Sequence, residues 1–575
     1  MRYPTLKSLL VVVIFLALPG LAQDEEISPI TTDMLPAAET VIGLEFSPAE
    51  RETMLADLNE QLASYQAIRA LQLANEVPPA LLFSPLPTTF TGTESYLREQ
   101  APVWSEGPPV TRPDDLDELA FWSVGRLAEL VRTRQVTSLE LTQLALDRLT
   151  RHGPRLECVV TLTTELALEQ AARADAEIAA GRYRGPLHGI PYGAKDLFAV
   201  PGYPTTWGAT PYRDQQLEDT ATVAQKLEEA GAVLVAKLTL GALAWGDVWF
   251  GGKTLNPWNP QQGSSGSSAG SAASVSAGLV PFALGTETWG SIVSPCTRCG
   301  VTGLRPTFGR VSRAGAMALS WSLDKVGAIC RTVEDCAVVF EAIRGPDRRD
   351  LTVGQYPFPY RSDLDLGSLR CGYLAAAFAE EYPGREYDQA TLEVLRGLGL
   401  ELVPIELPDL PLSDLSFILS AEAAAAFDEL TRSGRDDELV RQIRYAWPNV
   451  FRTARLIPAV EYIQANRVRF LLIQAMTELM AQVDLYVTPT FGGDNLLLTN
   501  LTGHPCVVVP NGFATVEETG TDAEATVQTT LDDRPERNPH SISFTGRLFD
   551  EATLLAVARA YQEATEFHRQ HPPGF

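Results

Sequence analysis

The sequence predicts an α/β protein, because predicted helices alternate with short buried strands. Residues 164–180 have helical periodicity and end at Gly181, and residues 219–230 form a second predicted helix that Gly231 closes. The apolar run at 232–237 follows directly and is typical of a buried strand. The chain has 575 residues, 45% of them hydrophobic, so it can bury a large core.

Residues 1–22 have the pattern of a secretory signal peptide. Arg2 and Lys7 supply the positive start, residues 9–18 are an unbroken apolar run, and Gly20-Leu-Ala22 offers a cleavage site. The apolar run is shorter than the about 20 residues that a membrane-spanning helix needs. We therefore expect an exported protein, periplasmic or secreted, with no stable membrane insertion after cleavage of the signal.

Residues 23–111 are predicted to be an N-terminal helical extension. Ser47-Pro-Ala-Glu50 combines an N-cap, a proline at the first helical position and a capping-box glutamate. Apolar residues then recur at steps of three and four until Pro78-Pro79 ends the helix. This helix is expected to pack on the main body or to face a partner protein, so the extension is compatible with a homo-oligomer.

Charge and cysteine content exclude some classes of function. Lysine and arginine number 46 against 72 for aspartate and glutamate, a formal net charge of −26. With no compensating basic stripe, neither nucleic acid nor an anionic membrane is an expected partner. The seven cysteines are too sparse for a disulfide framework, and the lone Cys296-Thr-Arg-Cys299 suggests a local disulfide or two buried thiols.

Two stretches carry the chemistry. Residues 263–303 begin as a loop of Gly, Ser and Ala, continue with many apolar residues, and include a second serine in Thr-Trp-Gly-Ser-Ile. Small residues at this density let backbone segments approach closely and leave amide N–H groups free for a ligand. Upstream, residues 189–196 form a predicted turn that contains Lys195 among apolar residues, where burial would lower the pKa of the amine.

These stretches resemble the amidase signature family of serine hydrolases. The family's three motifs match residues 189–196, 265–278 and 285–295 in the same order, and Ser291 follows Ser267 by 24 residues as in the family. The resemblance covers about four-fifths of the chain and implies an amidase domain at 112–575. It also implies a large mixed β-sheet flanked by helices on both faces.

The resemblance implies hydrolysis of a carboxylic amide without a metal or another cofactor. Ser291 would attack the carbonyl, while Ser267, held in a cis peptide bond, would pass the proton to the neutral amine of Lys195. Backbone N–H groups of Thr288, Trp289, Gly290 and Ser291 would stabilise the oxyanion. Ser268 and Asp196 are expected to support these groups. The substrate is expected to be a small-molecule or peptide amide.

Three residues depart from the family pattern. Trp289 stands where the family most often has Gly, and its ring is expected to narrow the pocket. Glu287 replaces the commoner Asp. Val293 replaces an Arg, so a substrate carboxylate is not expected to dock there. None of these changes removes a proposed catalytic group.

Other interpretations remain open at this point. Gly266-Ser-Ser-Ala-Gly270 matches the nucleophile elbow of α/β-hydrolases, which would make Ser268 the nucleophile of an esterase with a catalytic His. His188 and His504 are expected to be packed or surface residues instead. A catalytically lapsed, amidase-fold binding protein is a second alternative. Glutamine-dependent transfer to charged tRNA is a third, which the expected export and the acidic charge disfavour.

The C-terminal third is mostly helical between 369 and 481, where the family tends to build its substrate pocket. Residues 484–489 and 506–510 are predicted as buried strands, residues 514–539 as an acidic surface loop, and residues 551–565 as the last helix.

Overall fold

The computed structural model describes residues 30–70, 74–75, 77, 81–86, 100–107, 109–515 and 537–575. The chain divides into two compact units, Met1–Gln72 and Leu73–Phe575. The predicted segment 1–22 lies outside the described residues, as does most of the predicted loop at 514–539.

The first unit contains the predicted extension helix. Helix α1 spans Leu35–Ile42 and α2 spans Pro48–Arg69. The predicted capping box is present: the Glu50 N–H donates to Ser47 Oγ at 3.3 Å, and the Ser47 N–H donates to Glu50 Oε2 at 2.7 Å. Arg51 of α2 pairs with the buried Glu39 of α1 at 2.6 Å, which joins the two helices.

In the described part of the second unit, eleven strands form one mixed sheet in the order β1-β3-β2-β8-β10-β9-β14-β15-β13-β11-β12. The strands are β1 Val159–Leu162, β2 Pro191–Lys195, β3 Val233–Leu238, β8 Phe282–Glu287, β9 Thr302–Arg305, β10 Lys325–Cys330, β11 Arg370–Leu374, β12 Glu401–Ile405, β13 Leu485–Pro489, β14 Cys506–Thr515 and β15 Arg537–Gly546. Two hairpins stand apart from it: β4 Val248–Trp249 with β5 Gly252–Lys253, and β6 Leu255–Asn256 with β7 Asn259–Gly263.

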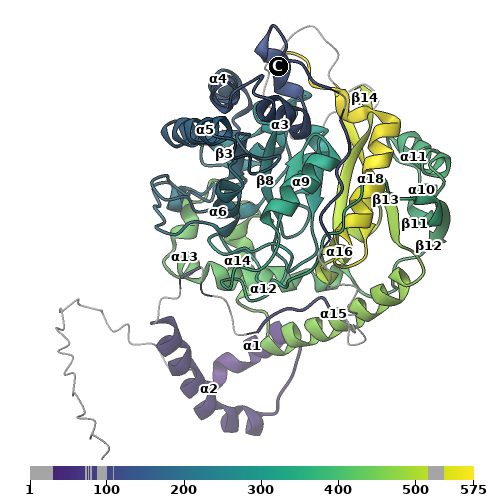
Figure 1. Cartoon of the computed structure of the whole chain (residues 1–575). Helices are drawn as coiled ribbons and strands as arrows, with labels where there is room; N and C mark the ends of the chain where they lie inside the picture. The colour runs from purple at the N-terminus through teal and green to yellow at the C-terminus, as the bar shows by residue number, and fades with distance from the viewer. Residues whose placement is uncertain are drawn as a thin grey trace, which may run out of the picture. The chain divides into compact units, whose positions relative to one another are not determined.

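Helices cover both faces of this sheet, as predicted (Figure 1). Neighbouring residues of β8 alternate between two apolar cores: Phe282 and Leu284 lie in one, and Ala283 lies in the other. The first core is completed by α3 Val124–Arg132, α6 Thr222–Glu229, α9 Val333–Ile343 and α18 Glu551–Thr565. The second is completed by α4 Ser138–Leu156, α5 Thr164–Ala179, α7 Ala269–Ser276 and α8 Val293–Cys299.

Further α-helices lie between residues 375 and 502. They are α10 Ala375–Ala379, α11 Arg385–Gly397, α12 Phe417–Ala426, α13 Asp428–Arg432, α14 Trp447–Ala454, α15 Ala459–Met480 and α16 Asn495–Thr502. The predicted strands at 484–489 and 506–510 correspond to β13 and to the first half of β14. No helix among the described residues is long and apolar enough to cross a membrane.

Two local predictions need correction. The helix predicted at 219–230 begins only at Thr222, and its N-cap is Ala221, whose methyl side chain cannot accept a hydrogen bond. The predicted turn around Lys195 is a strand: β2 pairs in parallel with β3 and with β8, so its backbone polar groups are satisfied by the sheet.

All seven cysteines are buried free thiols, including Cys296 and Cys299.

Candidate active site

The predicted site residues gather at one edge of the sheet, where β2 and β8 end side by side. Lys195 is the last residue of β2, and β8 ends at Glu287, four residues before Ser291. The two strands run parallel with Ala194 opposite Leu284, so their carboxyl ends lie at the same edge. This arrangement brings Lys195 next to the turn that contains Ser291.

The loop between β7 and α7 reaches the same edge because its residues are small. A Cβ atom on Gly266 would lie 1.8 Å from the carbonyl oxygen of Gly246, and one on Gly285 would lie 2.9 Å from Ser268 Oγ. A side chain at Gly266 would push the loop away from Gly246, and one at Gly285 would push it away from β8. The Gly266–Ser267 peptide bond is cis, as the resemblance implied.

Lys195 is the centre of a buried hydrogen-bond cluster. Its Nζ lies 2.8 Å from Ser267 Oγ, 3.0 Å from Ser268 Oγ and 2.9 Å from Thr286 Oγ1. The side chain has no exposed surface, and this burial holds the pKa of the amine well below its usual range. Sequence reasoning missed Thr286, although it lies inside the third motif.

Asp196 does not pair with Lys195. Its Oδ1 lies 2.6 Å from Nζ of the fully buried Lys237, and its Oδ2 accepts from the Thr206 N–H at 2.9 Å. Ala194 of β2 stands opposite Lys237 of β3, and alternate residues of a strand face the same side of the sheet. Asp196 therefore pairs with a second buried lysine on the other face of the sheet.

The turn from Thr288 to Ser291 offers backbone donors. Within the described residues, no acceptor is found for the N–H groups of residues 288–291. The next two N–H groups, of Ile292 and Val293, donate to Glu287 Oε2 at 2.8 and 2.9 Å. Free N–H groups beside a serine can donate to a negatively charged oxygen.

Glu287 fixes this turn although it replaces the family's commoner Asp. Its Oε1 lies 2.6 Å from Arg305 and accepts from Asn500 Nδ2 at 2.9 Å. Burial opposes ionisation of Glu287, but Arg305 and the backbone N–H groups outweigh it and lower its pKa to about 2. The glutamate is therefore an ionised cap for the start of α8.

Ser291 is close to the Ser267–Ser268 loop. The Ser268 N–H donates to the Ser291 carbonyl oxygen at 3.1 Å, and the Ser291 residue is 8% exposed. In the part of the chain that the structure describes, the Ser291 hydroxyl makes no hydrogen bond to Ser267. In free enzymes, catalytic hydrogen bonds are often long and tighten only when substrate binds.

The structure places the other departures from the family pattern. The Trp289 residue is 43% exposed, so much of it remains open to solvent. Val293 is buried in the apolar core that α8 shares with the sheet. Gly290 has a φ of +90°, and a Cβ atom there would lie 3.0 Å from Leu496, so both backbone and space favour glycine.

The hydrolase-elbow alternative finds little support in this geometry. Ser268 directly precedes α7 and comes five residues after the short strand β7. This strand was not predicted from the sequence. However, Ser268 is fully buried, and its Oγ is bonded to Lys195 and to the backbone of Thr286. His188 packs beside Glu177, and His504 packs beside Thr502. No histidine among the described residues is bonded to Ser268.

Comparisons with known proteins agree with this architecture. The amidase family profile matches residues 140–555. The glutamyl-tRNA(Gln) amidotransferase A subunit of Chloroflexus aurantiacus is 36% identical over 80% of this chain and 99% of its own length, and that of Methylococcus capsulatus is 33% identical over 79% and 99%. The peptide amidase of Stenotrophomonas maltophilia is a structural neighbour, with a TM-score of 0.67 and 28% identity over 80% of this chain and 99% of that one.

A bacterial aryl acylamidase of the amidase signature family has a TM-score of 0.68 over 79% of this chain and 99% of that one, but its 22% identity supports the fold alone. The amidotransferase relatives also overturn one prediction. They are named as A subunits of glutamyl-tRNA(Gln) amidotransferase, and with relatives that act on tRNA the prediction of export through a signal peptide is wrong. With the match over most of its length, this chain belongs to the amidase signature family of enzymes that act on amides.

Proposed function

We propose that the protein hydrolyses a carboxylic amide through an acyl-enzyme on Ser291, with Ser267 and Lys195 as the proton relay. One observation carries this proposal: the buried amine of Lys195 lies within hydrogen-bond distance of Ser267, and the neighbouring Asp196 pairs with Lys237 instead. A buried lysine without a carboxylate partner is favoured as the neutral amine, which is the form that can accept a proton.

The steps follow from this arrangement. Ser291 attacks the amide carbonyl carbon as its hydroxyl proton passes to Ser267, whose own proton passes to the Lys195 amine. The N–H groups of residues 288–291 stabilise the oxyanion, where one such donor is worth about 3–4 kcal/mol. The relay returns a proton to the leaving nitrogen as the C–N bond breaks. Water then attacks the ester on Ser291 and releases the acid.

A second candidate function differs from the first in its amide substrate. The relatives with 33–36% identity are amidotransferase A subunits, and the match spans 99% of their length. In that case the amide would be a side-chain carboxamide such as that of glutamine, and the ammonia would be used by a partner protein. The Stenotrophomonas peptide amidase favours a peptide amide instead. Both candidates use the same Ser291 chemistry.

The test combines labelling and turnover. A fluorophosphonate should add one mass adduct on Ser291 that is absent from Ser291→Ala, while an adduct on Ser268 would support the elbow alternative. Release of ammonia from glutamine and from peptide C-terminal amides, and of amine from aryl amides, then ranks the substrates. If no amide is turned over and no serine is labelled while a small molecule binds, the lapsed binding protein is the better interpretation.

A further inference from the structure

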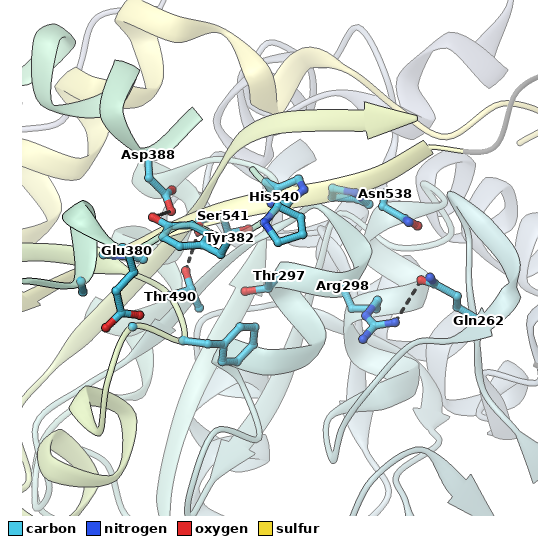
Figure 2. A pocket seen from close by; sticks show the side chains of 16 residues that line it. Gln262, Thr297, Arg298, Glu380, Tyr382, Asp388, Thr490, Asn538, His540 and Ser541 are labelled. Atoms are coloured by element: carbon cyan, nitrogen blue, oxygen red, sulfur yellow. Dashed lines mark hydrogen bonds between the residues drawn. The ribbon is translucent and has the colours of Figure 1, made fainter. Parts of the chain in front are cut away.

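A pocket of about 420 Å³ lies away from Ser291, between the ends of several elements. Its wall includes the last turn of α8, the loop before α11, the end of β13 with the following Phe491, and the first residues of β15 (Figure 2). Figure 2 shows Glu380, Tyr382 and Asp388 toward one end of the pocket, and Arg298 with Gln262 toward the other.

The strand register separates this pocket from the candidate active site. Four antiparallel pairings lead from β8 to β15, so the two strands run in the same direction, and Leu284 is level with Phe544. Glu287 lies three residues after Leu284, whereas Ser541, in the pocket wall, lies three residues before Phe544. The offset of six residues corresponds to about 20 Å along the strands. The pocket and Ser291 are at opposite edges of the sheet.

Asp388 is a buried acid in this wall. The residue is 6% exposed; its Oδ2 accepts from the Tyr382 hydroxyl at 2.8 Å and its Oδ1 accepts from Asn511 Nδ2 at 2.6 Å. Among the described residues, no lysine, arginine or histidine forms an ion pair with it. Burial therefore raises the pKa of Asp388 to about 6.

Three more groups near this acid suit a cation with an apolar body. Glu380 is an exposed acidic residue, and Phe491 is an aromatic residue that is 58% exposed. Cations are attracted to the faces of aromatic rings as well as to carboxylates. The Ser541 hydroxyl also lies in the wall, is buried, and has no hydrogen-bond partner in the described part of the chain.

A metal ion fits the pocket less well than an organic cation. Hard cations such as Ca²⁺ take six or more oxygen ligands. Within the described residues, no group of three or more His, Cys, Asp and Glu side chains could hold a metal. An organic ammonium needs only one buried carboxylate and an aromatic surface.

We propose that this pocket binds a small organic ammonium whose charged group meets Asp388 and Glu380 and whose apolar body lies against Phe491. The site is separate from the amide-hydrolysing centre and does not depend on it. Nothing in its chemistry requires Ser291, so binding is expected to persist when Ser291 is replaced.

The test is calorimetric titration of the full-length Ser291→Ala protein with benzylammonium, at a pH well above the pKa of about 6 that burial gives Asp388. Benzyl alcohol serves as the neutral analogue and Ca²⁺ as the metal control. Binding is then measured for Asp388→Asn, for Glu380→Gln, which changes an exposed residue that should not affect folding, and for Glu386→Gln. Glu386 is an exposed acid on the same helix as Asp388 and does not line the pocket.

Benzylammonium should bind the Ser291→Ala protein and its Glu386→Gln variant with the same affinity. Its affinity should fall about tenfold or more in the Asp388→Asn variant and measurably in the Glu380→Gln variant. Benzyl alcohol and Ca²⁺ should not compete with it. The proposal is overturned if benzylammonium does not bind, if the alcohol binds equally well, or if Glu380→Gln and a folded Asp388→Asn retain full affinity. Because the readout is binding to an inactivated protein, failure here leaves the proposed hydrolysis untouched.

Discussion

Two fully buried lysines on neighbouring strands should respond in opposite ways to the same substitution. Among the described residues, the Lys195 amine on β2 bonds only to hydroxyl and carbonyl oxygens, whereas Lys237 on β3 forms an ion pair with Asp196 at 2.6 Å. Replacing each with Met removes the amine and keeps an apolar chain of similar length. The comparison separates the chemical role of one lysine from the structural role of the other.

The magnitudes follow from these contacts. Proton transfer by a positioned group contributes about 10²–10⁴-fold, so Lys195→Met should lower kcat about 10³-fold, or about 4 kcal/mol. Its loss of stability should stay within about 1–3 kcal/mol, because only uncharged hydroxyl and carbonyl partners lose a hydrogen bond. Lys237→Met leaves the buried Asp196 carboxylate without its cationic partner, which should lower the free energy of unfolding by about 3–5 kcal/mol.

The assay pairs amide turnover with urea unfolding of both variants. Lys195→Met should be folded and inactive, and Lys237→Met should be less stable while its folded fraction keeps kcat within about tenfold of the parent. A Lys195→Met variant that keeps more than a tenth of the parent kcat would contradict the proposed role of Lys195 as proton acceptor. A larger loss of stability in Lys195→Met than in Lys237→Met would also contradict it, since Lys195 would then be the charged, structural partner.

Three further outcomes are expected. The kcat should rise with pH as Lys195 loses its proton and level off well below pH 10.5, because burial lowers its pKa; a pH–rate profile measures this. Ser267→Ala should lower kcat about 10³-fold, but Ser268→Ala only about tenfold, in the same turnover assay; equal losses would contradict the assigned roles. Glu287→Gln should destabilise the fold by about 3–5 kcal/mol in urea, because it leaves Arg305 buried and unpaired.

Much of the candidate site was predictable because it depends on short-range sequence patterns. Small residues around Ser267 and Gly285 predict a loop that packs closely on a strand, and the structure has that contact. The capping box at Ser47 likewise marks a real helix start, since the cap and its partner lie three residues apart. The family motifs add the order of these segments.

The remaining features depend on residues that the fold brings together from far apart. Glu287 is held by Arg305, 18 residues away, and by Asn500, 213 residues away, and neither pairing follows from a local pattern. The residues that line the proposed ammonium pocket are also far apart in the sequence, from Gln262 to Ser541. Such contacts require the strand order, which places β9 between β10 and β14.

The most informative correction concerns Lys195 and Asp196. In a turn, adjacent residues of opposite charge can pair, and the amine would then be held as an ammonium. In a strand, adjacent side chains point to opposite faces, and this separates the lysine from its neighbour. Asp196 reaches Lys237 on one face, while Lys195 reaches only serine and threonine oxygens on the other. At the end of β2, the Lys-Asp dipeptide therefore has an ion pair with Lys237 on one side of the sheet and, on the other, the buried amine that we propose as the proton acceptor.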